Sequence, residues 1–276
     1  MYKGKSAYDV LLFIVTLLIA VMFFFPIFFN LMSAFKSNSE IMRDAIALPT
    51  SLYLDSFKYL LTETEFPAAI VNSVVLTGLS IVFMVVVIPM AGYAIERSSA
   101  KWTGFVFLYF LAGMMIPFQA YMIPLFKELK MMGMYGNLVG PIVIYVSGSV
   151  GFGALLYTSF LKGVPREIEE SAAIDGCSRY GIFYRIVFPL LGPCTASMVV
   201  LNGLGIWNDF LMPMLVLPSG KPKTMIVEIF YYVGEFSSRW DMIFAGTAMS
   251  IVPILIVFLA LQKYFVKGIA TGAIKG

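Results

Sequence analysis

Residues 164–189 read VPREIEESAAIDGCSRYGIFYRIVFP, a charged stretch that lies between two long hydrophobic stretches. Charged side chains are costly inside a bilayer, so this stretch is predicted to be a loop in water between two membrane spans. Pro165 suits the first position of a helix, and the glutamates that follow it favour the positive end of the helix dipole. Gly176 is typical of a helix stop, and Ser178 of the cap of a second helix. The loop is therefore predicted to fold as a helix, a glycine turn and a second helix that ends at Pro189.

The composition of the chain indicates its class. Hydrophobic residues make up 60% of the 276 residues and charged residues only 13%, and the mean hydropathy is +0.88. These values lie far outside the range of soluble domains and predict an all-α integral membrane protein. The length suits a single transmembrane domain over residues 1–276. The formal net charge of +3 gives no indication of nucleic-acid binding, so membrane lipid is expected as a contact and nucleic acid is not.

Six stretches are long and apolar enough to cross a membrane as helices. The six expected transmembrane helices are residues 10–32, 68–95, 102–123, 136–161, 190–217 and 242–262. The fourth of them contains small residues that would let neighbouring helices approach closely, namely Ser147, Gly148, Gly151 and Gly153.

The distribution of positive charge predicts the orientation. With both termini in the cytoplasm, eleven of the 19 Lys and Arg residues would lie inside and eight outside. Cytoplasmic loops carry the excess of Lys and Arg in membrane proteins. We therefore expect cytoplasmic termini and a cytoplasmic loop at 164–189.

The loop resembles the EAA loop of ABC importer permeases, in which EAA is followed by a glycine and then by I-x-x-P. The residues that carry the match are Glu170, Ser171, Ala172, Asp175, Gly176, Ile186 and Pro189. Ser171, in place of the first Ala, is the one departure, and it is small enough to pack in the same way. The resemblance implies that these residues form a coupling loop, which fits a cleft on a cytoplasmic ATPase subunit and passes its closing motion to the membrane helices.

Further stretches are similar to those of carbohydrate permeases: LMSAFK at 31–36, MIP at 115–117, GIWNDF at 205–210 and the tail 262–276. The chain thus resembles the MalG-like subunit of carbohydrate importers across nearly its whole length. This implies a type I ABC importer permease fold in the cytoplasmic membrane of a prokaryote. It also implies a second, MalF-like permease, two ABC ATPase subunits and an extracytoplasmic sugar-binding protein as partners. ATP and Mg would be bound by the ATPases, and no cofactor by this chain.

Several polar residues within the expected spans are candidates for a solute pathway or a gate, because polar groups at that depth are expensive. They are Asn72, Gln119, Asn202, Asn208 and Asp209, together with Trp207, whose aromatic ring could stack on a sugar. Hydrogen bonding between helices is the commoner use of such residues, so a structural role stays open. For Asp209 a third alternative is an early helix end at the wet interface.

The chain has no histidine, and its two cysteines, Cys177 and Cys194, have no metal-ligand spacing. A histidine-ligated metal and a histidine-dependent catalytic triad are therefore excluded, and neither a metal site nor an enzyme is expected. The expected activity is alternating access to an oligosaccharide, with the binding protein docked on residues 33–65 and 218–241.

Two other classes remain open, a secondary transporter driven by an ion gradient and a membrane-embedded enzyme. The tail 267–276 is expected either to fray or to reach the ATPase pair.

Overall fold

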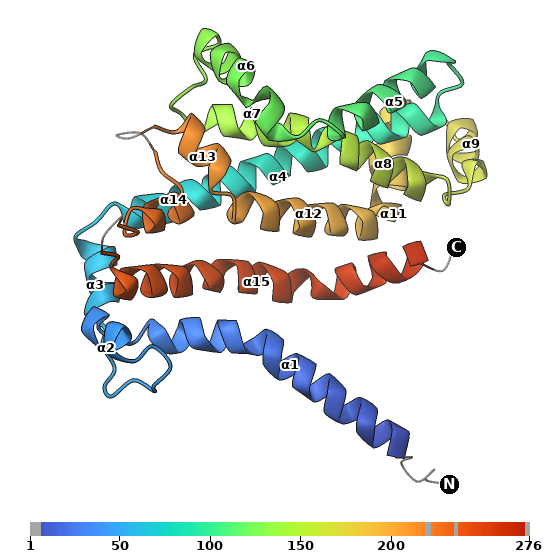
Figure 1. Cartoon of the computed structure of the whole chain (residues 1–276). Coiled ribbons are helices and arrows are strands. Elements are labelled where there is room, and N and C mark those ends of the chain that lie inside the picture. The colour runs from blue at the N-terminus through green and yellow to red at the C-terminus, as the bar shows by residue number, and fades with distance from the viewer. Residues whose placement is uncertain (1–6, 219–221, 235–236, 274–276) are drawn as a thin grey trace. The chain divides into compact units, whose positions relative to one another are not determined.

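The computed structural model describes residues 7–218, 222–234 and 237–273, with side chains as far as Ala260 except that of Phe258. The two termini, expected in the cytoplasm, lie outside the described residues. Within these ranges the regular elements are all helices (Figure 1). In chain order they are α1 (Ala7–Ser33), α2 (Asn38–Arg43), α3 (Asp55–Thr62), α4 (Phe66–Arg97), α5 (Trp102–Met114), α6 (Phe118–Met131), α7 (Val139–Gly148), α8 (Val150–Leu161), α9 (Arg166–Ile174), α10 (Arg179–Ile182), the π-helix η1 (Phe183–Val187), α11 (Phe188–Leu190), α12 (Gly192–Trp207), α13 (Leu211–Val216), α14 (Met225–Phe230) and α15 (Trp240–Ala273).

Four of the described helical stretches are long and apolar enough to cross a membrane. They are Tyr8–Ser33, Phe66–Arg97, Val139–Leu161 and Trp240–Val257. Two further stretches pass the same test only as bent pairs. Helix α5 meets α6 at 102°, and the helix 179–190 meets α12 at 73°. The protein is therefore a multi-pass membrane protein with up to six spans, if each bent pair is one span.

The helical ladder is interrupted inside two of the expected spans, where prolines and polar residues lie. In the stretch 102–123, α5 ends at Met114 and Pro117 caps α6 in an extended conformation. Proline lacks the N–H that continues a helix, and it disfavours helix in the residue before it. In the stretch 190–217, α12 ends at Trp207 and α13 begins only at Leu211.

Contacts divide the chain into two compact units. The first unit comprises the residues up to Pro67 together with Glu228–Val252, and the second comprises Ala68–Val227 together with the residues from Pro253 on.

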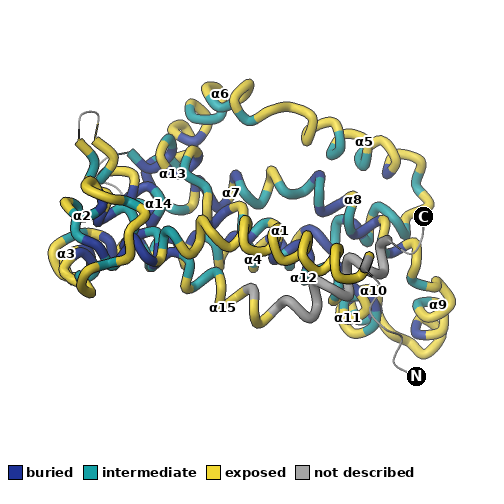
Figure 2. The backbone as a smooth tube through the Cα atoms, turned by 60° about the horizontal axis from the view of Figure 1, so that its bottom comes forward, coloured by how far each residue is buried: buried dark blue, intermediate teal, exposed yellow. Residues whose placement is uncertain are grey.

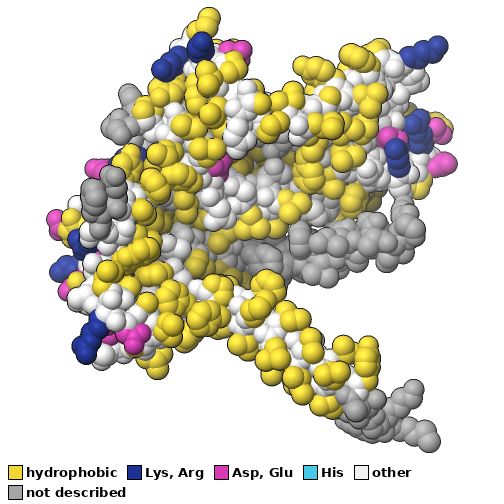
Figure 3. All heavy atoms as spheres, in the orientation of Figure 1, with side chains coloured by type: hydrophobic (Ala, Val, Ile, Leu, Met, Phe, Trp, Pro, Cys, Tyr) yellow, Lys and Arg dark blue, Asp and Glu magenta, His cyan; other side chains and the backbone are white. Residues whose placement is uncertain are grey.

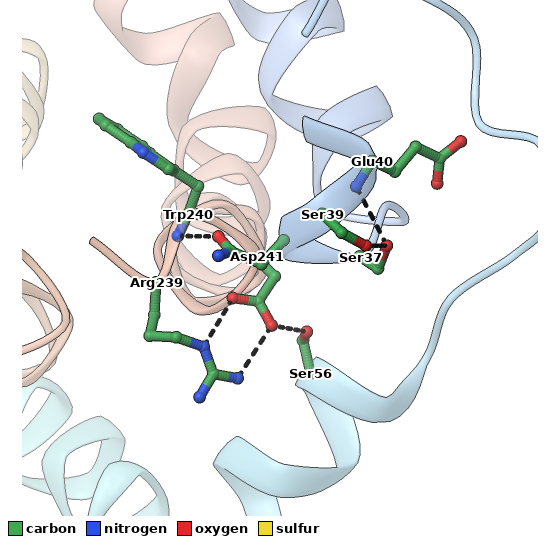
Figure 4. A network of polar contacts seen from close by, with 8 residues as sticks. Ser37, Ser39, Glu40, Ser56, Arg239, Trp240 and Asp241 are labelled. Carbon is green, nitrogen blue, oxygen red and sulfur yellow. Dashed lines mark hydrogen bonds and ion pairs between the residues drawn. The ribbon is translucent and has the colours of Figure 1, made fainter. Parts of the chain in front are cut away.

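In the first unit, the start of α15 is bound to α2 and α3 (Figure 4). Asn38 accepts the backbone N–H of Trp240 at 2.9 Å, and Ser56 donates to Asp241 at 3.1 Å. Arg239 donates to both carboxylate oxygens of Asp241, each at 3.1 Å. The Asp241 side chain is 2% exposed, so the pairing offsets the cost of burying its charge.

The loop that follows α1 in the first unit is held by side chains that bond to its backbone. Lys36 is fully buried, and its Nζ donates to the carbonyl oxygens of Asp44 at 3.3 Å and of Ala45 at 3.0 Å. The Thr50 N–H donates to Glu40 at 2.8 Å and holds the pKa of that carboxyl below its ordinary value. The loop is therefore an ordered structure and not a slack connection.

The core of the second unit is formed mainly by α4, α8 and α12. Small residues make the close approaches: a Cβ on Gly153 would collide with Ile88 of α4, and one on Gly92 would lie 2.6 Å from the Cβ of Tyr157. A Cβ on Gly151 would likewise collide with Met114 and with the carbonyl oxygen of Phe110, both of α5. Two of the predicted small positions, Gly151 and Gly153, are thus confirmed as close contacts, whereas a Cβ on Gly148 would meet no atom within 4 Å.

Charged residues gather at the two ends of the second unit. Helices α9 to α11 lie at one end, and α6 and α13 at the other (Figure 1). Charged side chains gather around α9 and around α6, and hydrophobic side chains cover much of the surface between them (Figure 3). This distribution suits a body that crosses a bilayer with one polar end on each side.

Candidate functional site

The charged loop folds as helix, glycine turn and helix, which confirms the prediction of its local structure. At the turn the Gly176 N–H donates to Ala173 and the Cys177 N–H to Ala172, at 3.1 and 3.0 Å, the two bonds of a Schellman motif. Gly176 has a φ of +84°, a left-handed conformation that glycine adopts without a Cβ clash. Ser178 caps α10 by accepting the Gly181 N–H at 3.2 Å. Pro165 is the N-cap of α9, one position before the predicted one.

The second helix does not end at Pro189, as predicted, but continues through it to Leu190. The turn before Pro189 widens into the π-helix η1, in which Phe188 donates to Phe183, five residues earlier. A proline ring collides with the carbonyl four residues before it in a regular α-helix, and the wider turn relieves that collision. The bend to α12 then follows at Leu191, where Gly192 and Pro193 open the next helix.

The seven EAA-like residues divide into an exposed and a covered set. Ala172 is buried against the core and Ile186 is half-buried. The others are exposed to solvent, namely Glu170, Ser171, Asp175, Gly176 and Pro189. Two large apolar side chains beside them, Ile174 and Tyr180, are 87% and 71% exposed. Most of α9 is open to solvent (Figure 2), so this end of the second unit presents a face of mixed charged and apolar character.

The inner face of α9 carries a set of contacts that the sequence analysis missed. The Glu169 carboxylate accepts from the Tyr93 hydroxyl at 2.7 Å and from Arg97 Nε at 2.7 Å. Arg97 also donates through Nη2 to the carbonyl oxygen of Val164 at 2.8 Å. A paired Arg and Tyr near the end of one span, and an unassigned glutamate in the loop, were the available signals. Nothing local in the sequence joins them.

Two of the pathway candidates, which lie in α12 or just after it, bond to residues in α7 or just after it. The Tyr145 hydroxyl donates to Asp209 Oδ2 at 2.9 Å, and the Met212 N–H donates to Asp209 Oδ1 at 3.3 Å. Four residues after Tyr145, the Ser149 hydroxyl donates to Asn202 Oδ1 at 2.8 Å. Asp209 itself lies in the break between α12 and α13, where it stands before the first turn of α13. These are bonds between helices, the commoner use of such residues.

The remaining candidates lie apart from that pair of contacts. Asn72 donates to the carbonyl of Lys223 at 3.0 Å, and the exposed Asn208 to that of Leu204, one turn back, at 2.9 Å. Gln119 is exposed on α6, and Trp207 is buried.

Trp207 lines a cavity of about 440 Å³ between α4, α12 and the Pro253–Val257 part of α15 in the second unit. Its other walls are formed by apolar and small residues such as Val74, Gly78, Val200 and Gly203. A sugar needs hydrogen-bond partners for its hydroxyl groups, so this cavity suits an apolar group and not a sugar.

Neither cysteine forms a disulfide: Cys177 is exposed and Cys194 buried. Among the residues with described side chains, no three metal-ligating groups lie together.

Known proteins match this chain over nearly its whole length. Residues 88–271 match the profile of the family described as "Binding-protein-dependent transport system inner membrane component". The chain is 33% identical over 261 residues to a probable starch degradation products transport system permease protein of Thermoanaerobacterium thermosulfurigenes, with 94% of each chain covered. It is 35% identical over 269 residues to an arabinooligosaccharides transport system permease protein of Halalkalibacterium halodurans, with 94% of this chain and 93% of that one covered.

A solved structure shares the fold. It is a bacterial alginate ABC transporter in complex with an alginate pentasaccharide-bound periplasmic protein, and it matches with a TM-score of 0.66 at 20% identity over 92% of this chain and 93% of that chain.

Proposed function

The chain belongs to the family of binding-protein-dependent transport system inner membrane components, and from this premise we propose that it is a permease subunit of an ABC importer for oligosaccharides. Its activity is the movement of solute, because members of this family are non-enzymatic components of transport systems. The sugar class rests on its relatives, which are permeases for starch degradation products and arabinooligosaccharides.

The observation that carries the proposal is the exposed face of α9 and the glycine turn. Glu170 and Asp175 offer carboxylates to a partner, and Ile174 offers an apolar side chain that is 87% exposed. Large exposed apolar groups rimmed by charge mark protein–protein contacts. The occupant of this face would be a cytoplasmic ATPase subunit, whose closure would pull on residues 164–189. The ATPases would hold the ATP and Mg.

The full assembly would include a second, MalF-like permease, two ATPase subunits and an extracytoplasmic sugar-binding protein. In the first unit, the segments 33–65 and 228–241 are joined through Asn38–Trp240 and Ser56–Asp241. This supports their use as one docking surface for the binding protein. Both termini and the coupling loop would then lie in the cytoplasm, as the excess of inner Lys and Arg favours.

The six polar residues of the membrane part receive different roles in this proposal. Asp209 and Asn202 would hold the break in the fifth span through Tyr145 and Ser149. The break would act as a hinge or gate when the permeases switch between their outward and inward states. Asn72, Gln119 and Asn208 would border the pathway, whereas Trp207 lines the apolar cavity, which does not suit a sugar.

The test is co-purification in mild detergent and ATP-dependent uptake after expression with the neighbouring genes. Glu170→Ala and a bulky replacement of Gly176 should release the ATPase or abolish uptake while the two permeases stay together. Glu128→Ala, at an exposed glutamate of α6 at the other end of the second unit (Figure 1), is the control and should leave both intact. If no ATPase co-purifies and uptake follows an ion gradient, the chain is a secondary transporter and the proposal is wrong.

A further inference from the structure

The coupling segment, residues 164–189, makes its contacts with α4 on one face of that helix. Tyr93 and Arg97 bind Glu169, and the Tyr184 hydroxyl of η1 lies 3.2 Å from the Met90 sulfur. Met90, Tyr93 and Arg97 are spaced i, i+3 and i+7, so they form one stripe on the last turns of the helix. The Phe183 ring lies on the same stripe, 5.1 Å from that of Tyr93.

The ion pair within this stripe is protected from water. The Arg97 and Glu169 side chains are 11% and 12% exposed, and the atoms Nε and Oε1 are 2.7 Å apart. Charge-assisted hydrogen bonds of this length are about twice as strong as neutral ones, and partial burial reduces the screening that weakens surface pairs. The second bond of Arg97, to the Val164 carbonyl, fixes the guanidinium in a single orientation. We name Tyr93, Arg97 and Glu169 the α4–α9 clamp.

The clamp matters because of the chain order. The coupling segment is covalently joined to α8 before it and to α12 after it. Helix α4 is not a chain neighbour of this segment, because Arg97 at its end lies 72 positions before Glu169 in the sequence. A displacement of α9 reaches α4 only through side-chain contacts. Apolar packing alone would permit sliding, whereas an ion pair with a second hydrogen bond fixes the register of the two helices.

We propose that the α4–α9 clamp makes α9 and the last turns of α4 move as one body, so that displacement of the coupling segment is delivered to a span it does not adjoin in the chain. This deepens the proposed function and rests on it. Glu169 and its neighbour Glu170 then have different tasks: Glu170 faces outward to the ATPase, and Glu169 faces inward to α4. Arg97 and Glu169 are positioning residues, since they act through α4 and touch no solute.

Removing a clamp that only stabilises the fold should have a different result from removing a clamp that transmits movement. Loss of a purely structural contact lowers the amount of assembled transporter, and hydrolysis and uptake fall together. Loss of a transmitting contact leaves the ATPase bound and active while uptake falls. The quantity that separates the two is the number of ATP molecules hydrolysed per sugar imported.

The first experiment compares Glu169→Gln and Arg97→Met with the wild type in the complete transporter reconstituted in liposomes. Uptake should fall about tenfold or more, as for the loss of one hydrogen bond to a charged group, with ATPase retention and hydrolysis kept. The variant Glu128→Gln, at an exposed position of α6 at the other end of the second unit, is the control and should leave the ratio unchanged. The charge-exchanged pair Arg97→Glu with Glu169→Arg should recover part of the uptake. An unchanged ratio in Glu169→Gln and Arg97→Met overturns the proposal.

A second measurement keeps the native clamp and so does not depend on the folding of these variants. Spin labels are placed at Ala94 on α4 and Glu167 on α9, both exposed, in a Cys177→Ser background where the remaining cysteine, Cys194, is buried. The distance between the labels should be the same without nucleotide and with trapped ATP. A distance that changes with nucleotide overturns the proposal. If the wild type shows no ATP-dependent uptake, the proposed function fails, which is a separate outcome.

Discussion

Two carboxylates at opposite ends of the second unit, Glu169 and Asp209, are held in different ways. Glu169 has a full counter-charge, the Arg97 guanidinium at 2.7 Å, in addition to the Tyr93 hydroxyl. Asp209 is held by neutral donors, the Tyr145 hydroxyl and the backbone N–H of Met212. Both are partly buried. The difference is therefore one of chemistry and not of exposure.

The comparison shows which kind of contact suits which task. A hydrogen-bonded ion pair has a defined geometry, and removing one partner costs much free energy when the other remains buried. It suits a link between two helices that are to stay in register, such as α4 and α9. Hydrogen bonds from neutral donors are weaker individually, and the break between α12 and α13 has two of them on one carboxylate. Such a break can change its arrangement at lower cost, as a hinge requires.

The largest effect is expected from Arg97→Met, which leaves the Glu169 carboxylate without its counter-charge. Removal of one partner of a buried pair costs roughly 3–5 kcal/mol. Because the two side chains are 11% and 12% exposed, we expect the lower end of this range. The free energy of unfolding, from SDS titration in mixed micelles, measures it. Adding Glu169→Gln to Arg97→Met should return part of the stability, and no recovery would contradict the ion-pair account.

A smaller effect is expected from Tyr145→Phe at the other end. The substitution removes the hydroxyl that donates to Asp209 and leaves the Met212 N–H in place. When a buried polar group loses a hydrogen-bond partner, the folded state is destabilised by about 1–3 kcal/mol. The same titration measures the loss, with Tyr109→Phe as control, because Tyr109 is 69% exposed on α5. Equal losses in Tyr145→Phe and Arg97→Met would remove the distinction between the two ends.

Gly176→Ala tests the turn beside Glu169. A left-handed conformation costs a residue with a Cβ about 1–2 kcal/mol, and no atom lies within 4 Å of the added Cβ, so the backbone alone causes the loss. The matched control is Gly148→Ala, where the added Cβ also meets nothing but φ is not in the left-handed range. There the better helix propensity of Ala should stabilise by up to about 1 kcal/mol. Opposite signs in thermal unfolding of the two variants are the expected result, and a loss in both would contradict it.

The smallest effect is expected from Asp209→Asn. The amide oxygen can still accept from the Met212 N–H, and the amide NH2 can donate to the Tyr145 hydroxyl, which then acts as the acceptor. The loss should therefore stay below about 1 kcal/mol, the difference between a charged and a neutral hydrogen bond. Glu169→Gln should cost more, since it leaves the Arg97 guanidinium without a carboxylate. The two variants are compared in parallel by SDS titration. If they lose the same stability, the two carboxylates are held alike and the comparison fails.

Local rules predicted the coupling loop well because each signal acts over a few residues. Gly176 supplies a left-handed φ and Ser178 a cap, and both appear in the structure as predicted. The helix ends at Leu190, one residue beyond the predicted end of the loop at Pro189, after a π-helical turn at 183–187. That wider turn accommodates the Pro189 ring.

The spans show the same limit. Their apolar character is readable along the chain, and the helices α1, α4 and α15 cover the predicted stretches, with α15 continuing beyond residue 262 to Ala273. The bend at residues 115–117 and the helix break at 208–210 depend on how far the surroundings satisfy the backbone groups that a proline or a polar residue leaves without a helical partner. Asp209 is an example: its partner Tyr145 is 64 positions away, and no spacing rule connects them.

By itself, the sequence determined that this protein is an all-helical membrane protein of the importer permease family with a helix–turn–helix loop. Hydropathy, turn chemistry and motif spacing are properties of neighbouring residues, and they act in any surroundings. Only the tertiary structure decided which of two adjacent glutamates faces inward. Glu169 and Glu170 are chemically the same, and what separates them is the position of Arg97 on α4, which the packing of α4 against the loop brings within 2.7 Å.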